Sequence, residues 1–326
     1  MSHAHREPTF RLRLDPWSAE YDASIQLSPE QPPPEVDSSV EGRAWTAVRP
    51  AGGAPSGPVA FVDGVRRIEH RLLLEGGASP LYGLLGSYAV GAAVLAGEAR
   101  IEHTEVQRIV CAGGGVALEP FLAPLPGNGH RLLFSPETVA ENTPAAPLQG
   151  LQNAMRRREA ALAEALAEEG ALTFLDGPLS FVSSPDAAVV GLVKRLVRTY
   201  LDPGAFELVP RLGVGERTPL FLIRHAREPR YSWYARIAAG RPIDASLAGI
   251  VRSETSAELP LARVAVLADV STALLPSLAS DSLRDARAPQ NLHPVGALER
   301  ELRRRLGDAP LVRRAIEAEL HRGAAA

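Results

Sequence analysis

The stretch PVAFVDGVRRIEHRLLLEGG, residues 58–77, decides the fold class of this chain. It holds two runs rich in β-forming residues, 59–65 and 67–74, and the second run alternates apolar with polar residues, as a strand with one buried face does. An uncharged run, 81–95, follows closely and favours a third strand, because its glycines and polar residues are unlike those of a membrane span. Three sequential strands with short connections predict an antiparallel meander.

The clearest helix lies further along, in LQGLQNAMRRREAALAEALAEE (148–169), and Gly170 marks its end. Apolar residues recur at helical spacing, at Leu151, Met155, Leu162 and Leu166. Directly after it, ALTFLDGPLSFV (171–182) reads as a buried strand interrupted by Asp-Gly-Pro. The other elements that we expect are a helix at 186–202, strands at 219–225, 231–237 and 262–270, and helices at 295–306 and 309–322.

The domain organisation follows from a change in composition. Residues 27–58 are rich in proline, serine and glycine, which favours a loop over a core element. We therefore expect residues 1–58 to be an N-terminal extension, with a strand at 10–27. Residues 59–326 are expected to form one α/β domain with a helical insertion near 148–169.

The overall composition limits the possible functions. The chain has 326 residues, of which 45% are apolar, so it can bury a large core. Its net charge of −3 excludes a protein coated in basic surface, and a nucleic-acid enzyme of this composition would need a local basic channel or a partner. The one cysteine, Cys111, allows no internal disulfide, and the N-terminal residues lack the apolar run of a secretory signal. We therefore expect a soluble cytoplasmic protein.

Two segments share a design that suits metal binding: FVDG at 61–64 and FLDGPL at 174–179. In each, an apolar strand ends on an aspartate, Asp63 or Asp176, and the following glycine permits a sharp turn. A single Asp-Gly pair is ordinary turn chemistry, but two such carboxylates can converge, and a divalent cation then relieves their repulsion. Glu159 adds a third carboxylate from the helix, unless it is a solvated helical glutamate. Two strand aspartates and one helical glutamate suit two-metal phosphodiester hydrolysis.

Short motifs in the same order resemble the NurA nuclease family. They are VDG (62–64), MRRRE (155–159), FLDGPL (174–179), VGLVKR (190–195), SWYAR (232–236) and the segment 274–294, which ends in RDARAPQNLHP. The resemblance implies a ribonuclease H-like fold: a mixed sheet with antiparallel first strands, helices on both faces and a helical insertion. It also implies that Asp63, Glu159 and Asp176 coordinate Mn²⁺ or Mg²⁺. Lys194, the only lysine, would sit on a helix near the site and steady the scissile phosphate.

The last motif departs from the family pattern. The family commonly has Tyr-Pro and a histidine eight residues after the tyrosine, whereas this chain has His293 and Pro294, followed by Glu301. His293 is either a substitute functional group, since histidine suits metal binding and proton transfer, or a sign that this corner is altered. Glu301 is either a replacement metal ligand or a surface glutamate paired with arginines of its own helix.

Three arginine clusters flank the proposed site elements and are candidates for contact with nucleic acid, because the guanidinium group recognises phosphate. The alternative interpretation is that each cluster of arginines is only a solvent-exposed face of its element. The candidates are Arg156, Arg157, Arg158, Arg195, Arg198, Arg284 and Arg287.

The resemblance implies a metal-dependent DNA nuclease, an exonuclease or endonuclease, that acts in DNA end processing and double-strand break repair. It also implies a homodimer that works beside a HerA-type hexameric ATPase. The altered last motif leaves an alternative open, a catalytically weakened subunit that binds DNA and docks the translocase. An aspartyl-phosphate phosphatase is disfavoured, because such enzymes need a second aspartate where this chain has Val65 or Pro178.

Overall fold

The structure is a computed structural model, and it describes residues 34–324 apart from 54, 76–78, 126, 128, 185, 197, 225–227, 282–284 and 286. The strand expected at 10–27 lies outside the described residues. The described residues form two compact units. The described residues of the first unit come from 34–53, 194–253 and 261–293, and those of the second come from 55–193, 254–260 and 294–324.

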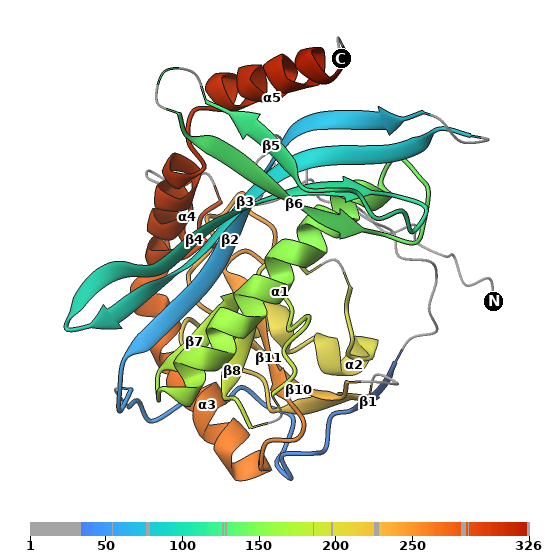
Figure 1. The fold of residues 1–326 in the computed structure, drawn as a ribbon. Coiled ribbons are helices and arrows are strands. Elements are labelled where there is room, and N and C mark those ends of the chain that lie inside the picture. The colour runs from blue at the N-terminus through green and yellow to red at the C-terminus, as the bar shows by residue number, and fades with distance from the viewer. Residues whose placement is uncertain are drawn as a thin grey trace. The chain divides into compact units, whose positions relative to one another are not determined.

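The second unit is built on a mixed sheet with the strand order β8-β7-β2-β3-β4-β6-β5 (Figure 1). The strands are β2 (Val59–Leu74), β3 (Leu81–Ala96), β4 (Glu98–Ala112), β5 (Phe121–Pro124), β6 (Arg131–Thr138), β7 (Leu172–Asp176) and β8 (Val189–Val193). β2, β3 and β4 are antiparallel neighbours, whereas β7 is parallel to β2 and β8 is parallel to β7. The predicted mixed sheet with antiparallel first strands is confirmed.

The meander differs from the prediction in one respect. The two runs at 59–65 and 67–74 form one strand, β2, because Gly64 and Arg66 continue the ladder with β3 opposite Val90 and Tyr88. Only a register shift between Ile68 and His70 interrupts the pairing. The run expected as the third strand, 81–95, is therefore the second strand of the meander, β3, and β4 is the third.

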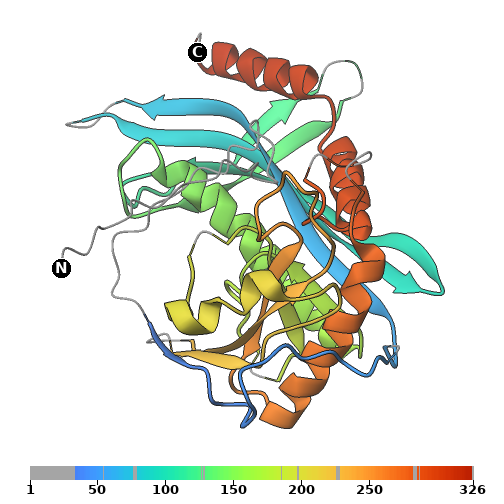
Figure 2. The ribbon, with the colours of Figure 1, turned by 180° about the vertical axis from the view of Figure 1, so that it is seen from behind.

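Helices cover both faces of this sheet, as predicted. α1 (Ala146–Glu168), the helix expected at 148–169, packs across β2, β3 and β7 in a core that includes Leu84. α5 (Ala309–Ala324) packs on the other face through Ile316, in a core that includes Leu85. Successive strand residues point to opposite faces, which is why Leu84 and Leu85 belong to different cores. Figures 1 and 2 show α5 beside β5 in both views.

The helix predicted at 186–202 is wrong, because its first half is strand β8. The β-branched residues Val189, Val190 and Val193 favour a strand, and β8 pairs in parallel with β7. Gly191 leaves room for the turn after β7, since a β-carbon there would lie 2.9 Å from the carbonyl oxygen of Gly177. The apolar pattern was compatible with both a helix and a buried strand.

The first unit contains a smaller set of strands in the order β1-β9-β10. Its elements are β1 (Glu35–Asp37), α2 (Pro203–Phe206), the 3₁₀ helix η1 (Val209–Arg211), β9 (Phe221–Arg224) and β10 (Arg230–Arg236). β1 lies inside the segment expected to be a loop, and its backbone pairs antiparallel with β9. A core around Phe221, Ile223, Tyr234 and Ile250 fills this unit.

The strand predicted at 262–270 is wrong, because the segment forms helix α3 (Leu261–Leu274), followed by the 3₁₀ helix η2 (Leu275–Leu278). Its buried residues Val264, Ala268 and Ser271 recur at helical spacing. Among the described residues, Leu261–Leu278 is the one helical stretch long and apolar enough to cross a membrane, which by itself is weak evidence of a span. The remaining elements, β11 (Ile250–Ser256) and α4 (His293–Arg305), contribute residues to both units.

Candidate metal centre

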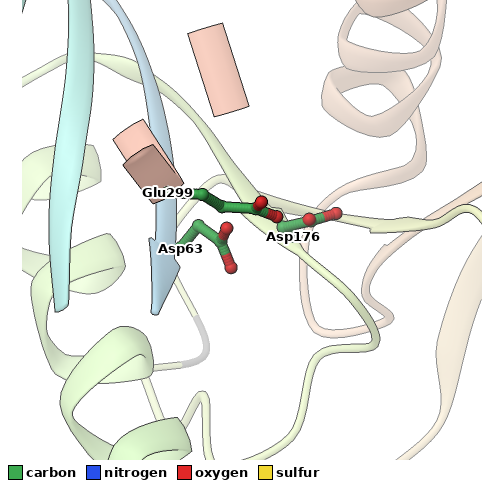
Figure 3. A group of neighbouring side chains, drawn as sticks. All are labelled: Asp63, Asp176 and Glu299. Atoms are coloured by element: carbon green, nitrogen blue, oxygen red, sulfur yellow. The ribbon is translucent and has the colours of Figure 1, made fainter. Parts of the chain in front are cut away.

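Three carboxylates from distant parts of the sequence converge within the second unit: Asp63 on β2, Asp176 at the end of β7 and Glu299 on α4. One oxygen of each lies within 4.8 Å of the others, and Figure 3 shows the three side chains pointing toward one another. Oxygens that bind a single Mg²⁺ or Ca²⁺ at about 2.0–2.6 Å are at most about 5 Å apart. The group therefore fits a hard divalent cation held by oxygen ligands.

The parallel pairing of β2 with β7 brings the two aspartates together. Val62 pairs with Leu175, so Asp63 and Asp176 follow at the same level of the sheet. Two residues before each aspartate stands a phenylalanine, and the rings of these two phenylalanines stack with their centroids 4.9 Å apart. Because residues i and i+2 of a strand share a face, the stacked rings and both carboxylates lie on one side of the sheet. This explains why the Phe-x-Asp-Gly pattern occurs twice in the sequence.

Helix α4 supplies the third carboxylate because it approaches the sheet directly opposite Asp63. The cross-strand partner of Asp63 is Gly91, where a β-carbon would lie 3.2 Å from Leu302 Cδ2 and 3.3 Å from Leu298 Cδ1. Both leucines are buried. Glu299 follows the first of them and precedes the second by three positions, so it borders the buried face of α4.

Glu159 lies on the α1 side of β2 and is not one of the three converging carboxylates. It is 5% exposed, and its carboxylate packs against the backbone of Gly64, where a β-carbon would collide with Glu159 Oε1. Burial raises the pKa of Glu159 to about 7; Arg156 opposes this rise, and the negative charge of Asp176 adds to it. The charge of Asp176 therefore acts on Glu159, although Glu159 lies on the opposite face of β2 from Asp63.

The raised pKa of Glu159 predicts a pH-dependent stability of the metal-free protein. The folded state holds this proton up to pH about 7, whereas the unfolded chain releases it near the ordinary glutamate pKa of 4.5. The stabilisation is therefore complete below pH 4.5 and is lost as the pH rises to 7. The free energy of unfolding should fall by about 3 kcal/mol over this pH range. We expect urea unfolding in EDTA to show a steeper loss of stability over this range for the wild type than for Glu159→Gln; parallel curves would contradict the assignment.

Glu301, the proposed replacement ligand, does not join the converging carboxylates. It accepts hydrogen bonds from Arg304 Nε and Arg305 Nε, each at 2.8 Å. These hydrogen bonds lower the pKa of Glu301 to about 2. The structure thus puts Glu301 in the surface ion pair that was the alternative interpretation, and α4 brings Glu299 to the aspartates instead.

Lys194 and His293 both belong to the first unit. Lys194 follows strand β8 and does not lie on a helix, which corrects the expected setting. It is buried, and its Nζ donates a hydrogen bond to Asn291 Oδ1 at 2.8 Å. His293 is exposed at the first residue of α4. Their roles in a reaction stay predictions.

The arginines beside Glu159 on α1 have carboxylate neighbours. Arg157 forms an ion pair with Glu137 at 2.8 Å, and Arg158 forms one with Glu105. Arg156 is half-buried. None of the three lies among the converging carboxylates, and their contact with nucleic acid stays a prediction.

The other predicted arginines that the structure describes belong to the first unit. Arg195 is half-buried, and the guanidinium of Arg198 lies 5.8 Å from the ring centre of Tyr200. Arg287 pairs with Asp285 at 3.3 Å. Arg284 lies outside the described residues.

No protein-family model and no curated protein matches the chain. Among solved structures, the crystal structure of the NurA nuclease from Sulfolobus solfataricus is similar to this chain. The match covers 88% of this chain and 90% of that one, with 10% sequence identity and a TM-score of 0.49. At this identity and TM-score the similarity does not transfer function, which has to come from the residues of the site.

Proposed function

We propose that this chain is a divalent-metal-dependent DNA nuclease in which Asp63, Asp176 and Glu299 hold the metal. The observation that carries the proposal is the convergence of these three carboxylates, which come from two strands and a helix far apart in sequence. Like charges so close disfavour their ionised forms. A bound divalent cation removes that penalty, and oxygen ligands are the ones such ions prefer.

The protein's own residues would hold the reacting groups in place. The Gly64 N–H donates to Asp63 Oδ1 at 2.8 Å, which orients that carboxylate, and the stacked phenylalanines fix the two strands that carry the aspartates. In phosphodiester hydrolysis, a metal held in this way supplies activation of the attacking water and stabilisation of the leaving oxygen. Asp63 and Asp176 come from rigid strands, so the ligands need little reorganisation on binding.

DNA as the substrate rests on the resemblance of the ordered motifs to the NurA family. On the same basis we propose a ribonuclease H-like fold, a role in DNA end processing, a homodimer and a HerA-type ATPase partner, with Mn²⁺ or Mg²⁺ as the metal. The mixed sheet with helices on both faces supports the fold. Because Glu299 joins the aspartates, the altered last motif is no argument for an inactive docking subunit.

The direct test is cleavage of single-stranded and linear duplex DNA by the purified protein, with Mn²⁺, with Mg²⁺ and with EDTA. We expect cleavage that needs a divalent metal. Absence of cleavage with either metal, even after addition of the cognate ATPase, would overturn the nuclease proposal.

Two glutamates on α4 give a matched pair of variants. We expect Glu299→Gln to reduce cleavage by about ten- to a hundredfold, because two aspartates remain while the third ligand is weakened. Glu301→Gln should stay within about twofold of the wild type, since Glu301 is not one of the converging carboxylates and its surface ion pairs with Arg304 and Arg305 contribute little. Initial rates at several Mn²⁺ concentrations measure both. Equal loss in the two variants would exclude Glu299 as the specific ligand.

A further inference from the structure

The loop after β7 carries an unusual exposed aromatic residue, Phe181. Its exposed fraction is 42%, and it is the only aromatic residue in the described part of the chain that is exposed. The other phenylalanines of the second unit, such as Phe61 and Phe174, are buried. An isolated exposed apolar residue needs no explanation by itself, so the case rests on how Phe181 is held.

The backbone of Phe181 adopts a left-handed conformation, with φ of +67°. Glycine or asparagine adopts this region at little cost, whereas a bulky residue there is a conformational outlier. If the loop needed only a turn at this position, glycine would provide it. Strained backbone of this kind is concentrated at functional sites.

Both sides of Phe181 are anchored to the second unit. On one side, Leu179 is buried and its N–H donates to Glu254 Oε1 at 2.8 Å. On the other side, the N–H groups of Ser183 and Ser184 donate to Glu164 Oε1 on α1, at 2.5 and 2.6 Å. The ring of Phe181 is therefore presented from a fixed backbone, so binding a ligand costs little ordering of the loop.

The loop also keeps Phe181 close to the proposed metal site. Phe181 follows Asp176 by five positions along the chain, and an extended chain spans at most about 3.3–3.6 Å per residue, so the two Cα atoms lie within about 18 Å of each other. Stacked bases repeat every ~3.4 Å along a strand, so a strand that runs from Asp176 to Phe181 needs at most about five nucleotides to span them.

We propose that Phe181 is a stacking platform for an unpaired nucleobase of the strand being cut, so that single-stranded or frayed ends are the preferred substrate class. This inference rests on the proposed nuclease function and deepens it. Aromatic side chains bind single strands by stacking, because every base has a π-face. A base pair inside a duplex offers no such face. A protein partner is disfavoured, because the neighbours of Phe181 in the loop are largely serines and not the apolar surround of an interface hot spot.

The test uses a single-stranded oligonucleotide that carries 2-aminopurine, whose fluorescence is quenched on stacking, with EDTA present so that the strand is not cut. We expect Phe181→Ala to weaken binding by about 5- to 150-fold and to remove the quenching. Phe181→Trp should retain both, whereas Phe181→Leu, which keeps an apolar side chain without a π-face, should behave like the alanine variant. Affinity for a blunt duplex should not change. Phe181→Gly, which relieves the backbone, should unfold at the same or a higher temperature than the wild type.

Cleavage kinetics separate this inference from the nuclease proposal. With Mn²⁺, Phe181→Ala should raise KM for single strands and leave kcat nearly unchanged. If the wild type does not cut but quenches the probe through Phe181, the nuclease proposal fails and the stacking platform stands. The stacking platform is wrong if the wild type cuts DNA and Phe181→Ala or Phe181→Leu binds the oligonucleotide and quenches 2-aminopurine as strongly as the wild type does. The stacking platform is also wrong if Phe181→Ala no longer binds a partner ATPase but still binds single-stranded DNA like the wild type.

Discussion

Replacing Asp176 by asparagine should abolish cleavage and at the same time stabilise the metal-free protein. The activity should fall by at least about 10³-fold, because the variant loses a charged ligand at the position where charge must be balanced during the reaction. The metal-free fold should become more stable, because the substitution removes a negative charge that lies beside Asp63 and Glu299 and that adds to the raised pKa of buried Glu159. Function and stability thus oppose each other at this position.

The DNA cleavage assay measures the loss of activity, thermal unfolding without Mn²⁺ measures the gain in stability, and thermal unfolding with Mn²⁺ shows whether the metal still binds. At a hundredfold excess of metal over its Kd, the wild type should gain about 2.7 kcal/mol of stability, whereas Asp176→Asn should gain almost none. Asp63→Asn should also lose the response to metal. Glu169→Gln, which changes an exposed carboxylate at the end of α1, is the matched control and should behave like the wild type. A wild-type response to metal in Asp176→Asn would exclude Asp176 as a ligand.

Periodicity predicted α1 but failed for β8 and α3, for two different reasons. The helix at 148–169 has a continuous apolar stripe with charges opposite, and α1 follows it closely. The segment that became β8 is buried throughout its first four residues, so no polar face showed its period. In α3, the alternation of Val264 and Val266 suggested a strand, but Val266 is 61% exposed and the buried positions follow the helical spacing.

The same reasoning explains which site residues the sequence could indicate. The repeated Phe-x-Asp-Gly pattern reflects the parallel pairing of β2 with β7, so Asp63 and Asp176 were recognisable as a pair. Glu299 was missed because the spacing of the family motif directed attention to Glu301. The buried stripe Val295, Leu298 and Leu302 was visible in the sequence, and it places Glu299, not Glu301, at the border of the buried face. Which helix approaches which strand is a tertiary property that no local pattern contains.

Replacing Gly64 by alanine should destabilise the protein by about 1–3 kcal/mol, the usual cost of overpacking. The new methyl group would collide with Glu159 Oε1 and lie 2.9 Å from Met155 Cγ. β2 cannot easily move away, since it pairs with β3 on one side and with β7 on the other. Glu159 must therefore leave its place. If its carboxylate assists the metal site, cleavage by Gly64→Ala should fall to the level of Glu159→Ala.

A double-mutant cycle identifies the collision that causes the loss. Removing the Glu159 side chain makes room for the methyl group, so Gly64→Ala should cost less stability in the Glu159→Ala background than in the wild type, with a coupling of at least about 0.5 kcal/mol. Gly53→Ala is the control, because no atom lies within 4 Å of a β-carbon there and its backbone is not left-handed. Additive effects of the two substitutions would mean that Met155, and not Glu159, bears the strain. In that case Gly64 serves the packing of α1 on the sheet, and the approach of Glu159 to the strand behind Asp63 loses its support as part of the site.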